Sequence, residues 1–193
     1  MQRSAITPYL SPTFAVDRSE LPSWSQVSDK RLAHIDRVTE LLASWTTQLG
    51  LPDAEAAEWK DAGRWHDALR DAPESDLRAI TRDEARHARI LHGHAAALLL
   101  EKDGESRRNL LDAIKWHTTG CATWSRTGRA LYMADYLEPG REFLQDERGF
   151  LARQVPLDFD GVFREVVRHR IDWTVREGRV LYDETVELWN SIR

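Results

Sequence analysis

Apolar residues recur every three or four positions along most of the chain, which is the spacing of one buried face of an α-helix. The first such stripe lies between Ser25 and Leu49, and Gly50 and Pro52 predict its end. Its members are Leu32, Ile35, Val38, Leu41, Leu42, Trp45 and Leu49. No segment alternates apolar and polar residues as a half-buried strand does, so the pattern predicts an all-α helical bundle.

Stripes and stop signals predict further helices along the rest of the chain. They cover residues 53–69, 74–80, 92–101, 106–120, 125–138, 162–178 and 183 onward. Asp53, Ser106, Ser125 and Asp183 are the expected N-caps, because short polar side chains accept hydrogen bonds from the free N–H groups of a first turn. Pro139 and Gly140 predict the end of the helix that contains Leu131 and Leu137.

The N-terminal segment differs from the rest. Residues 1–24 contain Pro8, Pro12 and Pro22 and no sustained periodicity, so we expect an irregular extension there. The remaining residues, 25–193, are enough for one domain with its own core. We therefore expect one functional domain, preceded by the extension.

Composition narrows the class of protein. The formal charge of -5 gives no global attraction to nucleic acid, and no segment has the apolar length of a membrane span or a secretory signal. Cys121 is the only cysteine, which excludes an internal disulfide and fits a reducing compartment. We expect a cytoplasmic protein with neither nucleic acid nor membrane as a partner, and a homodimer stays open.

Two inward-facing histidines suggest a metal site. His34 shares its helical phase with Val38 and Trp45, where an unpaired imidazole is costly. His66 shares a face with Trp59 and is followed directly by a carboxylate, Asp67. Taken singly, His34 reads as a hydrogen-bonded core residue and the His-Asp pair as a surface pair near a helix end.

Three further residues strengthen the metal interpretation. His92 opens one predicted helix, His117 closes the next, and Asp135 lies inside the one after that. Each has a separate alternative interpretation: His92 as a loop residue, His117 as a basic residue at a helix C-terminus, and Asp135 as a buried carboxylate paired with an arginine. One shared site is more economical, and four imidazoles with two carboxylates suit iron, manganese, nickel, cobalt or zinc better than calcium or magnesium.

Five motifs occur in a recognisable order. They are R-x-x-H at residues 31–34, HD at 66–67, HG at 92–93, HTTG at 117–120 and ADYLEPGR at 134–141. Over residues 28–193 the chain resembles the YqeK family of bacterial HD-domain proteins, which hydrolyse diadenosine tetraphosphate symmetrically. The HTTG and ADYLEPGR segments carry most of this resemblance, because a lone HD pair is common.

The resemblance implies a nucleotide phosphohydrolase with two divalent or mixed-valent transition metal ions, iron before manganese, cobalt, nickel or zinc. The implied ligands are His34, His66, Asp67, His92, His117 and Asp135. It also places Arg31, Arg70, Thr118, Glu138 and Arg141 at the substrate, with Asp67 and Arg70 in the catalytic machinery. The chain departs from the family in its N-terminal extension, in Arg64-Trp65 and in Trp124, which leaves the ligands intact but puts substrate preference in doubt.

Two metal ions can lower the pKa of a water and neutralise the phosphate oxygens under attack. Arg31 and Arg70 each lie three positions from a predicted ligand and are candidate phosphate clamps, with a solvated arginine as the alternative for each. The resemblance, and not the spacing, implies cleavage to two ADP. Other HD-type substrates, such as nucleoside monophosphates, deoxynucleotides or cyclic dinucleotides, and a silent nucleotide-binding HD domain stay as alternatives. Trp116 and Trp124 could stack on adenine, but core packing is the preferred interpretation.

Overall fold

The computed structural model describes residues 17–193, and within this range all regular structure is helical. A 3-10 helix, η1 (Arg18–Glu20), precedes nine α-helices. These are α1 (Asp29–Gln48), α2 (Asp53–Trp65), α3 (Glu74–Thr81), α4 (Ala88–Lys102), α5 (Arg108–Trp116), α6 (Arg126–Leu137), α7 (Gln145–Gln154), α8 (Phe159–Arg176) and α9 (Asp183–Ile192). The predicted all-α class is confirmed.

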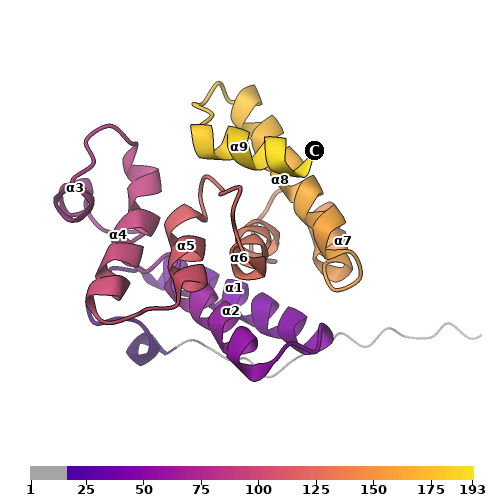
Figure 1. Cartoon of the computed structure of the whole chain (residues 1–193), viewed down its shortest axis with the longest axis horizontal. Coiled ribbons are helices and arrows are strands. Elements are labelled where there is room, and N and C mark those ends of the chain that lie inside the picture. The colour runs from indigo at the N-terminus through magenta and orange to yellow at the C-terminus, as the bar shows by residue number, and fades with distance from the viewer. Residues whose placement is uncertain (1–16) are drawn as a thin grey trace, which may run out of the picture.

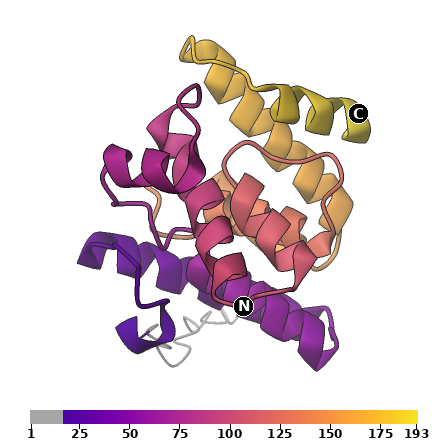
Figure 2. The same cartoon turned by 60° about the vertical axis from the view of Figure 1, so that its left-hand side comes forward.

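Helix α6 lies at the centre of the bundle. It contacts α1, α2, α5, α7 and α8, and the α1–α2 pair and the α8–α9 pair lie toward opposite ends of the molecule (Figures 1 and 2). Ala130, Leu131, Met133 and Ala134 are fully buried on successive sides of this helix. A helix that is apolar on all sides belongs in a core, and this places Asp135, on the same helix, deep in the bundle.

The second helix is shorter than its pattern predicts. It ends at Trp65, so His66 and Asp67 lie in the turns that follow it and not on its face. The cause is pairing with the segment before α1: the Gln26 N–H donates to the Ala68 carbonyl at 2.8 Å, and the Asp71 N–H donates to the Gln26 carbonyl at 3.3 Å. These bonds replace the helical ladder and turn the HD pair inward.

Several predicted helix starts also shift by a few residues. Pro52, Arg107 and Tyr182 are the N-caps where Asp53, Ser106 and Asp183 were expected. Both aspartates lie inside the first turn, where a carboxylate is stabilised by the positive end of the helix dipole.

Helix α4 begins before His92, at Ala88, because the His87 side chain accepts a bond from Arg89 N–H and caps it. Ser125 does precede α6 as predicted, but its side chain makes no capping bond.

Helix α7 is absent from the prediction, because its only buried residue is Arg148 and it has no apolar stripe. The Arg148 guanidinium donates to the carbonyls of Tyr136 at 2.7 Å, Arg141 at 3.0 Å and Phe143 at 3.2 Å. These bonds satisfy a charge that would otherwise be costly to bury. Arg148 therefore docks α7 beneath the segment after α6, and the partly buried Leu151 and Ala152 add contacts with the core.

The predicted N-terminal extension, residues 1–24, lies in part outside the described residues, because the structure describes only 17–24 of it. Leu21 packs against Ile35, and the Trp24 indole N–H donates to Asp103 at 2.7 Å. The boundary at residue 25 stays a prediction. In the described part of the chain, no helix combines the length and apolar character needed to cross a membrane.

Candidate metal centre

The Asp67 carboxylate lies at the centre of the candidate site, between two pairs of histidines. Its Oδ1 is 3.0 Å from His92 Nε2 and 3.4 Å from His117 Nε2. Its Oδ2 is 3.6 Å from both His34 Nε2 and His66 Nε2. All five side chains are buried. The turn after α2 thus presents one carboxylate oxygen to each pair.

Two groups of metal-ligating atoms result. One comprises His34, His66 and Asp67, the other comprises Asp67, His92 and His117, and within each group the ligand atoms lie within 4.8 Å of one another. Asp135 joins the first group, because its Oδ1 is 3.2 Å from His34 Nε2. The structure therefore brings all six predicted ligands together.

Backbone carbonyls set the orientation of two imidazoles. His66 Nδ1 lies 2.8 Å from the Gly63 carbonyl, and His117 Nδ1 lies 2.7 Å from the Ile114 carbonyl. A carbonyl can only accept, so both Nδ1 atoms carry the proton and both Nε2 atoms present a lone pair to the centre. Burial lowers the pKa of His66 to about 3, which keeps this ring neutral at pH 7.

Glu138 orients the third imidazole, His34. Its Oε1 lies 3.2 Å from His34 Nδ1. Arg37 Nε also donates to this carboxylate, and the Gly140 N–H donates to it at 2.6 Å. Burial opposes ionisation of Glu138, but the bonds from His34 and Arg37 outweigh it and lower its pKa to about 2. Burial likewise disfavours a charged His34, yet its bonds to Asp135 and Glu138 raise the pKa of His34 to about 9. A cation at this position must therefore displace a proton from His34 Nε2.

The close approach of the imidazole nitrogens around Asp67 is better explained by bound metal ions than by core packing alone. His66 Nε2 lies 3.4 Å from His34 Nε2, and His92 Nε2 lies 3.0 Å from His117 Nε2. Buried nitrogen lone pairs at such distances repel unless a proton or a cation lies between them, and Nδ1 of His92 has no hydrogen-bond partner among the described residues. Burial opposes ionisation of Asp67, but the neighbouring imidazoles outweigh it and hold the pKa of Asp67 well below its usual range. Transition metals bind neutral imidazoles beside an ionised carboxylate. His66 and Asp67 are already in these states, whereas His34 must first lose a proton.

The position after His92 has no room for a side chain, which explains the glycine there. A Cβ at this position would lie 2.6 Å from the Ile114 carbonyl oxygen and 3.0 Å from the His117 ring. Helix α4 can therefore approach the end of α5 only without a side chain here. The HG motif thus supplies one ligand, His92, and room for another, His117.

We expect Gly93→Ala to destabilise the fold by about 1–3 kcal/mol, because the added methyl overpacks a backbone carbonyl and pushes the His117 ring. It should also lower metal binding by the His92–His117 pair. Denaturant unfolding and metal titration measure the two effects. Gly149→Ala on α7 is the matched control, since its Cβ would meet only Arg153 at 3.6 Å. Equal stability for the two variants would contradict this explanation.

The five predicted substrate residues lie in different settings. Arg31 Nη1 is 2.7 Å from Asp67 Oδ2, and Arg141 Nη2 is 2.6 Å from Asp135 Oδ1. The Arg70 guanidinium makes no hydrogen bond or ion pair with the described residues. Burial lowers the pKa of His92, and the charge of Arg70 adds a smaller effect in the same direction. Arg141 and Thr118 line the pocket described below, whereas Arg31 and Arg70 do not.

Glu138 is the exception among them. Only 1% of it is exposed, and it accepts bonds from Arg37 and the Gly140 N–H beside His34. It does not line the pocket, but its Oε1 lies 3.6 Å from Nε of Arg141, which does. A direct contact of Glu138 with substrate stays a prediction, whereas its contact with His34 is part of the structure. Pro139-Gly140 folds the chain back and carries the Glu138 side chain inward.

Arg170, on α8, belongs to the site but was not predicted. Its Nη1 lies 3.4 Å from Asp135 Oδ2, it donates to the Thr118 carbonyl at 3.3 Å, and its guanidinium stacks 4.0 Å from the Tyr132 ring centroid. A signal was present in the sequence. Arg170 follows the buried Val166 by four positions, so a charge lies on the apolar face of a helix.

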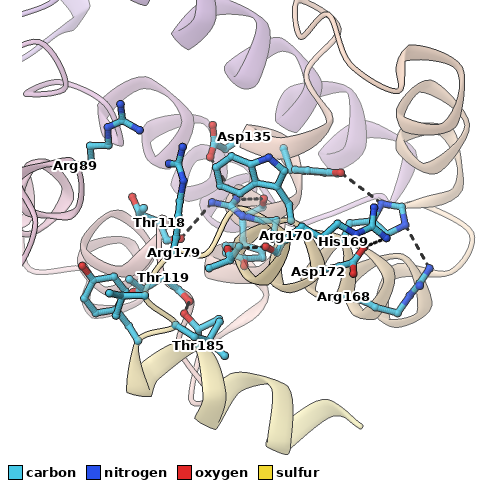
Figure 3. A pocket seen from close by; sticks show the side chains of 18 of the residues that line it. Arg89, Thr118, Thr119, Asp135, Arg168, His169, Arg170, Asp172, Arg179 and Thr185 are labelled. Atoms are coloured by element: carbon cyan, nitrogen blue, oxygen red, sulfur yellow. Dashed lines mark hydrogen bonds and ion pairs between the residues drawn. The ribbon is translucent and has the colours of Figure 1, made fainter.

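A pocket of about 1280 Å³ opens beside the centre. Six arginines and three carboxylates line it, including Arg89 from α4, Arg170 from α8 and Arg179 from the segment before α9 (Figure 3). Of the six predicted ligands only Asp135 lines it. Asp135 is thus where the pocket meets the metal-ligating cluster, and the excess of arginine suits an anionic ligand.

Known proteins resemble this chain in sequence, and one solved structure resembles it in fold. A symmetrical bis(5'-nucleosyl)-tetraphosphatase of Staphylococcus aureus is 24% identical, over 91% of this chain and 93% of that protein. The Bacillus subtilis protein of the same name is 26% identical, over 61% of this chain and 66% of its own. No family model matches the chain.

A solved structure from Clostridium acetobutylicum, described as a predicted HD superfamily hydrolase involved in NAD metabolism, superposes with a TM-score of 0.74. It is 26% identical and covers 86% of this chain and 90% of its own. The chain is an HD-domain relative of these tetraphosphatases.

Two departures of this HD domain from the family pattern contact each other. The Arg64 guanidinium pairs with the Glu20 carboxylate at 3.0 Å, and the Trp65 indole N–H donates to the Glu20 carbonyl at 3.3 Å. Arg64-Trp65 therefore forms the contact surface for η1, at the described end of the N-terminal segment. The third departure, Trp124, is a core residue: it is buried, donates to the Asp112 carbonyl at 3.0 Å and packs on Gly128.

The two tryptophans considered for adenine stacking lie elsewhere in the HD domain. Trp124 is buried in the core, and Trp116 lies against His94, Arg86 and Lys115. Neither lines the large pocket. Core packing, the preferred interpretation, is confirmed for Trp124.

Proposed function

We propose that this chain hydrolyses dinucleoside polyphosphates, cleaving diadenosine tetraphosphate symmetrically into two ADP. The observation that carries the proposal is the Asp67 carboxylate, with one oxygen beside each histidine pair, next to a pocket rich in arginine. The tetraphosphatases of Staphylococcus aureus and Bacillus subtilis support the substrate and the symmetrical cleavage.

Six side chains of this chain would hold two transition metal ions, and Asp67, with one oxygen beside each histidine pair, would contribute to both sites. We propose iron as the physiological metal, because borderline imidazole and carboxylate ligands suit it. When bound, such ions supply a water of lowered pKa and positive charge for the phosphate oxygens. Glu138 holds the proton on His34 Nδ1, which leaves Nε2 available as a ligand.

Arginines complete the proposed site. Arg141 and Arg170 each approach one oxygen of Asp135, so they fix this carboxylate where the pocket begins. Arg31 fixes Asp67 in the same way. Arg70 has no carboxylate partner among the described residues, so its guanidinium is available to an incoming phosphate.

Product analysis tests the proposal. Anaerobically purified protein, supplied with diadenosine tetraphosphate, should release two ADP for each molecule consumed, and His66→Ala should release none. ATP plus AMP would indicate an asymmetric hydrolase. Faster turnover of a monophosphate, a deoxynucleotide or a cyclic dinucleotide would reassign the substrate, and no turnover of any nucleotide would leave a silent binding domain.

The support of His34 by Glu138 gives a separate prediction. We expect Glu138→Ala to lower activity or metal affinity about 10- to 100-fold, because hydrogen-bond partners of metal-binding histidines contribute to this extent. Steady-state kinetics at several metal concentrations measure the change. Glu142→Ala is the control, since Glu142 is exposed on the same segment. Activity equal to that of the control would remove Glu138 from the site.

A further inference from the structure

The large pocket extends well beyond Asp135, toward an exposed tryptophan. Trp173 lies three residues after Arg170 on α8, so the two side chains project from the same side of the helix. Both line the pocket, and Arg170 Nη1 lies 3.4 Å from Asp135 Oδ2. A continuous surface therefore leads from the metal-ligating cluster to the Trp173 ring, one helical turn further along α8.

Trp173 is exposed in a way that core packing does not explain. Its exposed fraction is 51%, and the Arg179 guanidinium lies 4.4 Å from its ring centroid. Neither residue belongs to the predicted catalytic or substrate set. A large aromatic face kept half open inside a basic pocket is suited to a flat aromatic ligand.

The end of α8 holds Arg179 over this ring. Gly178 adopts a φ of +61°, the Gly178 N–H donates to the Val175 carbonyl at 3.1 Å, and the Arg179 N–H donates to the Thr174 carbonyl at 3.0 Å. This is a Schellman-type helix end, in which a left-handed glycine reverses the chain. The Arg179 side chain is thereby directed back across α8 and into the pocket (Figure 3).

We propose that Trp173 and Arg179 form the binding site for the purine base of one nucleoside half of the substrate. This proposal rests on the function proposed above. The base concerned belongs to the nucleoside that lies further from the metal-ligating cluster. The purine stacks on the Trp173 ring in place of the Arg179 guanidinium. Arg179 then turns to the polyphosphate, alongside Arg170 and Arg89, which line the same pocket.

The test compares two substrates that differ only in the second nucleoside: diadenosine tetraphosphate and adenosine 5'-tetraphosphate. We expect Trp173→Ala to lower the ratio of kcat/KM for diadenosine tetraphosphate to kcat/KM for adenosine 5'-tetraphosphate about tenfold. This is the size expected for the loss of one stacked base. The loss should appear mainly in KM, and Trp173→Phe should restore most of it. Arg179→Ala should lower the same ratio.

Val175→Ala is the matched control, because Val175 is 63% exposed on the same turn of α8 and does not line the pocket. An equal effect of Trp173→Ala on both substrates, or none on either, would overturn the assignment while wild-type release of two ADP leaves the proposed function standing. If the wild-type protein hydrolyses neither substrate, both proposals fail together.

Discussion

Replacing Asp67 with asparagine should abolish hydrolysis of diadenosine tetraphosphate, with a loss in kcat of at least about a thousandfold, or about 4 kcal/mol of transition-state stabilisation. Asp67 lies between both histidine pairs, with one oxygen toward each. Asparagine keeps the shape but loses the negative charge and one of the two acceptor oxygens. Steady-state kinetics with excess metal measure the loss.

Asp76→Asn is the control for this experiment, since Asp76 is an exposed carboxylate in the first turn of α3. Its activity should match that of the wild type. His94→Ala should also leave catalysis nearly unchanged, because His94 contacts Ile90, Arg86 and Trp116 and not the metal-ligating cluster. Near wild-type turnover in Asp67→Asn would exclude a contribution of this carboxylate to both sites.

Replacing Asp135 with alanine should have the second largest effect, a loss in kcat/KM on the order of 10²- to 10³-fold, or about 3–4 kcal/mol. The substitution removes a neighbour of His34 and leaves Arg141 and Arg170 without the carboxylate that they share. Metal content should fall less than in Asp67→Asn, because Asp135 belongs to one group of ligands only.

Asp160→Asn serves as the control for Asp135. It also removes an ion-paired carboxylate, the partner of Arg129, but on the exposed first turn of α8. Kinetics and elemental analysis of both variants distinguish a metal-binding role of Asp135 from a purely structural ion pair. If Asp135→Ala keeps its full activity, Asp135 is a structural partner of two arginines and nothing more.

The helical fold could be predicted from the sequence because most of its helices bury an apolar stripe. The stripe of α1, with Ile35, Val38 and Leu42 fully buried, is of this kind. Helix α7 could not be found in this way, because its one fully buried side chain is Arg148, which donates to carbonyls, and its apolar Leu151 and Ala152 are only partly buried. Periodicity has no signal for such an anchor.

The candidate ligands could be named from motif order, but the geometry of the HD pair could not. The sequence placed His66 and Asp67 on the face of α2, whereas the bonds between Gln26 and the residues after Asp67 end that helix early. A strand-like pairing of two segments more than forty positions apart leaves no local pattern. The turn that it creates is what directs both oxygens of Asp67 toward separate histidine pairs.

The arginines of the pocket were the hardest to predict. Arg170 and Arg179 lie outside the five motifs, and in a sequence rich in arginine only the helical phase of Arg170, shared with Val166, distinguishes either of them. Packing makes them special: Arg170 lies between Asp135 and the Tyr132 ring, and Arg179 covers Trp173.

We propose that the six side chains would hold two metal ions and that Asp67 would contribute one oxygen to each site. Crystals of anaerobically purified protein, measured at the absorption edge of the bound metal, test it directly through anomalous scattering. We expect two anomalous peaks, one between Asp67 and the His34–His66 pair and one between Asp67 and the His92–His117 pair. A metal-loaded protein with no peak beside Asp67, or with its ions elsewhere, would contradict it.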